Sequence, residues 1–86
     1  MIRTFEELFA KIRLAGHDSP RLESMHEGFV LWREQYRQSS GTAELAARVH
    51  MNRYRDNLQG YLSCLQETAY ICQSEYDRLW SSLNTD

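Results

Sequence analysis

Hydrophobic residues recur along this chain at steps of three and four positions, which is the period of an amphipathic α-helix. The clearest series runs through Leu22, Met25, Phe29, Trp32 and Tyr36. No segment shows the strict alternation of hydrophobic and polar residues that is typical of a half-buried strand. The pattern therefore predicts an all-α protein, a small antiparallel helical bundle of three or four helices.

Capping residues, glycine and proline indicate where the helices begin and end. Thr4, with Glu7 three residues later, has the spacing of a capping box. Gly16 stands where a left-handed residue ends a helix, and Ser19-Pro20 is a typical helix start. With a polar loop at residues 38–41, these signals predict a single domain over residues 1–86, with helices at about 5–15, 20–38, 42–58 and 61–83.

The apolar series of the C-terminal half changes phase near Gly60, where two steps of four follow each other. Glycine inside a helix costs about 1 kcal/mol relative to alanine, so both signals predict a break or kink there. Either the chain folds back near Gly60 into a fourth helix, or a long helix self-associates as a coiled-coil homodimer. The second alternative assigns the contact between copies to Leu62, Leu65, Tyr76, Leu79 and Leu83.

Two short segments, residues 29–32 and 69–72, are apolar on every side of their predicted helices. A helix that is apolar all round must be covered all round, so at least one of these belts is expected to face a partner protein. Tryptophan and arginine are enriched at interface hot spots. The residues predicted to contact a partner are Trp32, Tyr70, Ile71 and Trp80, with Arg33, Arg37, Arg48 and Arg53 as polar anchors.

The charge of the chain is nearly balanced overall but unevenly distributed. Its formal net charge of −2 excludes a uniformly basic nucleic-acid binder. Residues 33–55 hold five arginines against two glutamates, whereas residues 56–86 hold one arginine against five acidic residues. The arginine cluster could meet either phosphates or an acidic protein surface.

The segment from Thr42 to Tyr54 resembles the first helix and turn of a helix-turn-helix, with Ala46 as its small residue and His50 at the turn. The resemblance implies a DNA-binding regulator that uses residues 42–62. It stops after about twenty residues, because Asp56 and Gln59 stand where the second helix needs apolar positions. Nucleic-acid binding is therefore the alternative hypothesis.

Motifs that carry catalysis or metal binding are sparse in this chain. Glu23 and His26 have the Glu-x-x-His spacing of di-iron bundles, but such a site needs ligands from several helices and the motif occurs once. The sequence contains no phosphate-binding glycine loop, Cys-x-x-Cys pair or zinc-protease motif. We expect no enzyme activity, no metal and no cofactor.

Cys64 and Cys72 lie eight residues apart in a segment predicted as one helix, about 12 Å along its axis, which is too far for a disulfide. Both are expected to be buried thiols. No apolar run resembles a signal peptide or a membrane span, so we expect a cytoplasmic protein without membrane contact. The sequence predicts a small non-enzymatic helical protein-binding module, acting as an adaptor, a dedicated chaperone or an inhibitor of a larger protein machine.

Overall fold

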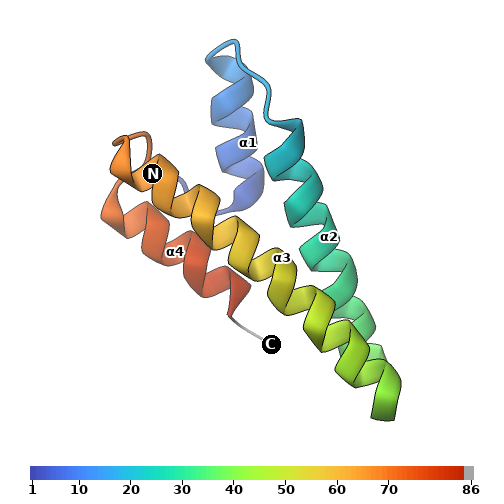
Figure 1. Cartoon of the computed structure of the whole chain (residues 1–86). Helices are drawn as coiled ribbons and strands as arrows, with labels where there is room; N and C mark the ends of the chain where they lie inside the picture. Colours follow the sequence, from blue (N-terminus) through green and yellow to red (C-terminus); the bar gives the residue numbers. More distant parts are fainter. Residues whose placement is uncertain (85–86) are drawn as a thin grey trace.

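The computed structural model, which describes residues 1–84, confirms the all-α prediction. Its helices are α1 (Phe5–Leu14), α2 (Pro20–Gln38), α3 (Gly41–Glu67) and α4 (Gln73–Leu83), and residues 1–84 form no strand. The loop at Ser39 and Ser40 turns the chain back, so α2 and α3 lie side by side as a helical hairpin (Figure 1). Helix α1 lies beside α2, and α4 lies beside α3, both toward the end of the hairpin that is farther from this loop.

The hydrophobic core fills the space where α1 and α4 cover the hairpin. Its fully buried side chains come from all four helices and from the turn before α4. They are Leu8, Phe29, Leu58, Leu62, Ile71, Leu79 and Leu83. None of the helices within residues 1–84 combines the length and the apolar character that crossing a bilayer requires.

Helix α1 begins and ends as its sequence predicts, apart from one hydrogen bond. The Thr4 hydroxyl accepts a hydrogen bond from the Glu7 backbone N–H at 3.2 Å. The Glu7 carboxylate accepts from the N–H of Arg3 at 2.9 Å, so the capping box is only half formed. Gly16 has a φ of 82°, and the N–H groups of Gly16 and His17 donate back to Arg13 and Ile12. This is the Schellman arrangement, which satisfies the last carbonyls of the helix.

The predicted break near Gly60 is wrong, because α3 continues through this residue to Glu67. A Cβ placed on Gly60 would meet no atom within 4 Å, so the glycine lies on an open helix surface. Leu58 and Leu62 on either side of it are fully buried. The burial of these two leucines outweighs the cost of placing a glycine inside a helix, which is about 1 kcal/mol relative to alanine. The predicted bounds 42–58 and 61–83 are replaced by those of α3 and α4.

The chain instead turns back at residues 68–72. Ala69 adopts a left-handed conformation with a φ of 62°. The N–H groups of Ala69 and Tyr70 donate to the carbonyls of Gln66 and Leu65, a second Schellman arrangement. Ala69–Cys72 is thus a turn, and the prediction that it is a helical belt is wrong. Figure 1 shows the resulting fold-back of α4 onto α3.

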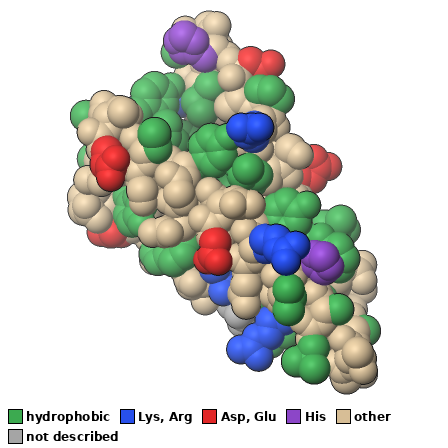
Figure 2. All heavy atoms as spheres, in the orientation of Figure 1, with side chains coloured by type: hydrophobic (Ala, Val, Ile, Leu, Met, Phe, Trp, Pro, Cys, Tyr) green, Lys and Arg blue, Asp and Glu red, His purple; other side chains and the backbone are tan. Residues whose placement is uncertain are grey.

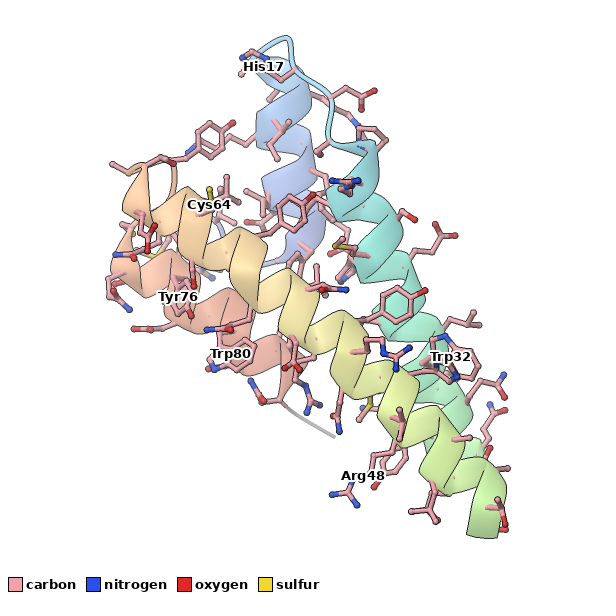
Figure 3. All side chains as sticks on the ribbon, in the orientation of Figure 1. His17, Trp32, Arg48, Cys64, Tyr76 and Trp80 are labelled. Atoms are coloured by element: carbon pink, nitrogen blue, oxygen red, sulfur yellow. The ribbon has the colours of Figure 1, made fainter. Side chains whose placement is uncertain are left out.

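The late turn also changes the interpretation of the two cysteines. Cys64 lies on α3 and Cys72 is the N-cap residue of α4, so one helix does not separate them. Both are free and exposed, which contradicts the prediction of buried thiols. Figure 3 shows the Cys64 side chain on the outer side of α3.

Polar contacts fasten the N-terminal segment to the fold-back. The Glu75 carboxylate accepts hydrogen bonds from the N–H of Cys72 at 2.9 Å and from the N–H of Ile2 at 2.8 Å. These two bonds lower the pKa of Glu75 to about 2, because they favour the charged carboxylate. Lys11 donates to the Tyr70 carbonyl at 2.8 Å and lies over the Tyr70 ring. Helix α1 is therefore bound to α4 and to the turn before it.

Candidate protein-contact surface

About half of the helical hairpin extends beyond the helices that cover it. Helix α3, with 27 residues, is about 40 Å long. Helices α1 and α4 have 10 and 11 residues, which makes each about 16 Å long. The half of the hairpin next to the loop at Ser39 and Ser40 therefore projects from the four-helix part, and the molecule measures 43 × 22 × 17 Å (Figure 1).

Exposed hydrophobic side chains gather on this projecting half and at its border with α1, where Val30 lines a hollow together with Phe5 and Glu6. Val30 and Leu31 on α2 are 40% and 56% exposed, and Leu45 and Val49 on α3 are 62% and 55% exposed. Within residues 1–84 the other large hydrophobic side chains that are exposed are Met1 and Leu14, both in the N-terminal part. Figure 2 shows hydrophobic and basic side chains mixed over the loop end of the hairpin. Such a concentration on a small protein is typical of an interaction surface.

Two arginines identify the side of the hairpin on which α4 ends. Arg33 on α2 donates to the Ser82 carbonyl at 3.2 Å, and Arg55 on α3 donates to the Leu83 carbonyl at 2.9 Å. Both guanidinium groups also lie over the Phe29 ring, at 5.1 and 5.7 Å from its centre. Residues three, four or seven apart share a side of a helix, so this side can be followed toward the loop.

We call the surface that continues from this point the hairpin face. Val30 lies three residues before Arg33 and borders the same hollow as Phe29 and Ser82. Arg37 lies one turn after Arg33, and Arg48 lies two turns before Arg55. Leu45 lies three residues before Arg48 and shares its side of α3, whereas Val49 lies on the outer side of the helix. Figure 3 shows Arg48 pointing toward the side where α4 lies. The hairpin face comprises Val30, Arg33, Arg37, Arg48 and Leu45, and it continues over the outer side of α3 to Val49.

The hairpin face carries an excess of positive charge. Within residues 1–84 no ion pair involves Arg33, Arg37 or Arg48, whereas Arg13 in α1 is paired with Glu23. The nearby acidic residues are Glu44, four positions before Arg48, and Glu34, which accepts a hydrogen bond from Gln38 at 2.8 Å. On the hairpin face, exposed apolar side chains therefore lie among three arginines.

The opposite side of the hairpin is occupied by contacts within the chain. The rings of Trp32 and His50 are stacked, with centres 4.3 Å apart and planes inclined by 22°. Tyr54 packs so closely over Gly28 that an added Cβ would come within 2.5 Å of its ring. Arg53 follows His50 by three residues and Val49 by four, so it lies between this side and the outer side of α3. Trp32 is half-buried there, and Figure 3 shows it away from Arg48.

The eight residues predicted to contact a partner therefore do not form one surface. Arg33, Arg37 and Arg48 share the hairpin face, Trp32 lies on the opposite side of the hairpin, and Arg53 lies one turn from Val49 on α3. The other three lie in or near the fold-back, where Tyr70 is half-buried under Lys11 and Trp80 is half-buried on α4. Ile71 is 2% exposed and belongs to the core, so its assignment as a contact residue is wrong.

The seam assigned to self-association is largely covered within one copy of the chain. Leu62, Leu79 and Leu83 are at most 1% exposed. Leu65 and Tyr76 are half-buried and pack against the same core. The fold-back of α4 onto α3 covers these residues, so the structure does not present them as a contact between copies.

The helix-turn-helix resemblance has no counterpart in the fold. Residues 42–62 lie on one continuous helix, and His50, where the motif needs its turn, is in the middle of α3. Stacking of His50 on Trp32 accounts for this histidine as part of the hairpin. The implied arrangement of two short helices is therefore wrong.

The Glu-x-x-His pair of α2 takes part in packing between helices. His26 stacks on Phe5 at 4.4 Å and meets the edge of Phe9 at 5.6 Å. Burial lowers the pKa of His26, with Arg33 acting in the same direction and Glu6 opposing it. Glu23 is paired with Arg13. Within residues 1–84 no three His, Cys, Asp or Glu side chains are grouped so that they could hold a metal ion.

Sequence reasoning missed Leu45 and Val49, the most exposed apolar pair of the hairpin face. They lie four residues apart, off the seam formed by Ala47 and Met51, which are both buried. Two apolar residues one turn apart and off the buried stripe predict an exposed apolar patch. The sequence analysis assigned this segment to a helix-turn-helix instead. The chain matches no protein-family model, no curated protein and no solved structure.

Proposed function

We propose that this chain is a non-enzymatic protein-binding module and that the hairpin face is its contact surface. The observation that carries the proposal is the position of Leu45 and Val49, which are exposed on a part of α3 that only α2 covers. Burying them against a partner would remove apolar surface from water, which favours association. Arginines between apolar patches fit the composition of protein interfaces.

In this proposal the module acts in the cytoplasm as an adaptor, a dedicated chaperone or an inhibitor of a larger protein machine. Two exposed thiols are compatible with a reducing compartment. A homodimer through residues 62–83 is not part of the proposal, because the core already covers Leu62, Leu79 and Leu83. Nucleic-acid binding is the alternative, and it now depends only on the arginines.

Site-specific photo-crosslinking in the source cell tests the proposal. A photo-reactive amino acid replaces Leu45 in one variant and Leu14, an exposed leucine at the end of α1, in the matched control. We expect a discrete adduct with another protein from position 45 and none from position 14. Equal adducts from both positions, or no protein adduct from position 45, would contradict the proposal.

A further inference from the structure

We propose that two copies of this chain associate through the outer sides of their α3 helices, which run antiparallel in the dimer. The inference rests on the proposed function in one respect, because it names a second copy as the partner that covers Val49, the outer end of the hairpin face. The arginines of the hairpin face lie outside this contact. They are Arg33, Arg37 and Arg48.

The outer side of α3 carries a second series of positions at steps of four and three, separate from the buried seam. It runs along the whole helix, which has 27 residues and is about 40 Å long. Its members are exposed, apart from Ser63, which is half-buried. Steps of four and three are the repeat through which two helices pair as a coiled coil. The series is Thr42, Ala46, Val49, Arg53, Asp56, Gly60, Ser63 and Glu67.

This series is symmetric about its centre, so it fits an antiparallel copy of itself. When Arg53 lies beside Asp56 of the second copy, Val49 of one chain is at the level of Gly60 of the other. A two-fold axis between the two chains forms each of these contacts twice, which closes the dimer.

The surface of α3 around Gly60 has the shape that such a contact needs. Asn57, Gly60, Tyr61 and Cys64 line an open hollow of about 330 Å³. Their spacing is that of the four residues that form a hole for an incoming side chain in a coiled coil. Because a Cβ on Gly60 would meet no atom within 4 Å, a second helix can approach closely there. Val49, which is 55% exposed, is the apolar side chain at the matching level.

The charges of α3 favour a second copy over other occupants. Residues 41–55 hold three arginines against one glutamate, whereas residues 56–67 hold Asp56 and Glu67 and no basic residue. Antiparallel pairing therefore places the basic half of each helix against the acidic half of the other. An acidic or a basic partner would complement only one half. Within residues 1–84 neither Arg53 nor Asp56 forms an ion pair, so both are available to the second copy.

Sedimentation equilibrium of the full chain tests the inference with charge-reversed variants. We expect the parent protein to form dimers. Arg53→Glu and Asp56→Arg should each weaken dimerisation at least about tenfold, because each places like charges opposite each other twice. An equimolar mixture of the two variants should recover dimers, because two acidic residues on one chain then face two arginines on the other.

Arg37→Glu is the matched control, because it reverses an exposed arginine on α2, away from the outer side of α3. We expect it to dimerise like the parent protein. Circular dichroism establishes that all variants keep their helical fold. A monomeric parent, a mixture that associates no better than the single variants, or an equal loss in Arg37→Glu would overturn the inference.

Photo-crosslinking separates this inference from the proposed function. A photo-reactive residue at position 49 should capture a second copy of the chain near Gly60, as mapped by mass spectrometry. Capture of a different protein at position 49 would overturn the inference. If the parent is monomeric but position 45 captures another protein, the proposed function stands and the dimer is overturned. A monomeric parent without a protein adduct at position 45 would contradict both.

Discussion

Ala69 carries the conformational cost of the fold-back. Within residues 1–84 it is the only non-glycine residue with a positive φ, 62°. Its Cβ is unfavourably close to the backbone in this conformation, which costs about 1 kcal/mol or more. Gly16 meets the same requirement at the end of α1 with a φ of 82° and without that cost. One residue therefore decides how favourable the turn before α4 is.

Replacing Ala69 by glycine should stabilise the protein. We expect Ala69→Gly to raise the free energy of unfolding by about 0.5 to 1 kcal/mol, because glycine relieves the left-handed strain but adds entropy to the unfolded chain. Urea denaturation measures the change. Ala46→Gly, at an exposed position inside α3, is the control and should lower stability by about 1 kcal/mol. A loss of stability in both variants would contradict the turn at Ala69.

Two glycines of the hairpin should respond to alanine in opposite directions. Gly60→Ala should raise the free energy of unfolding by up to about 1 kcal/mol, because a Cβ there meets no atom within 4 Å and alanine favours the helix. Gly28→Ala should lower it, because its Cβ would come within 2.5 Å of the Tyr54 ring. Thermal unfolding of both variants checks this. A destabilised Gly60→Ala would mean that α3 is interrupted at Gly60.

At the scale of the elements, α1 and α4 are joined by the Glu75 carboxylate. It accepts hydrogen bonds from residues that precede the two helices, through the N–H groups of Ile2 and Cys72. The same carboxylate therefore caps α4 and holds the chain just before α1. Together with Lys11 on the Tyr70 carbonyl, it fixes the short helices against the hairpin.

The lowered pKa of Glu75 predicts a loss of stability in acid. Its pKa is about 2 in the folded protein and about 4.5 when unperturbed. The charged form therefore stabilises the fold above pH 4.5, and this contribution disappears as the pH falls from 4.5 toward 2. Glu75→Gln should lower the urea midpoint at pH 7 and reduce its change over that acid range.

Glu67→Gln, at an exposed glutamate at the end of α3, is the control for this prediction. It should leave both the urea midpoint and its pH dependence close to those of the parent protein. An unchanged midpoint in Glu75→Gln at pH 7 would show that the Ile2 and Cys72 hydrogen bonds contribute nothing to stability.

At the scale of the whole molecule, the apolar residues divide between a core and a surface available for binding. Helix α3 contributes to both, because its second half packs against α4 and its first half is covered only by α2. A short α4 therefore leaves the loop half of the hairpin uncovered. Leucine side chains are therefore buried in the second half of α3, as at Leu62, and exposed in its first half, as at Leu45.

Two alanine substitutions on α3 should separate these roles. Leu62→Ala should lower the free energy of unfolding by about 2 to 5 kcal/mol, because Leu62 is fully buried and leaves a cavity. Leu45→Ala should change it by less than about 0.5 kcal/mol, because Leu45 is 62% exposed. Urea denaturation measures both. Similar losses in the two variants would contradict the division of α3 into a core half and a surface half.

The sequence by itself determined the features that depend on neighbouring residues. Apolar steps of three and four identified the helices, and Gly16, Ser19-Pro20 and the polar loop at 38–41 predicted the limits of α1 and α2 closely. These signals act within one or two helical turns, so they can be read without knowing the fold. Even here the detail was incomplete, since the Ser19 hydroxyl makes no capping hydrogen bond.

The tertiary structure decided the features that depend on distant contacts. Packing of Leu58 and Leu62 carries α3 through Gly60, and the turn occurs at Ala69, a residue with no turn preference of its own. That turn covers Leu79 and Leu83 and buries Ile71. The sequence indicated Arg37 and Arg48 but not the exposed pair Leu45 and Val49. The position at which α4 ends decides which part of α3 stays exposed. This position depends on the fold-back, so the pattern of neighbouring residues does not predict it.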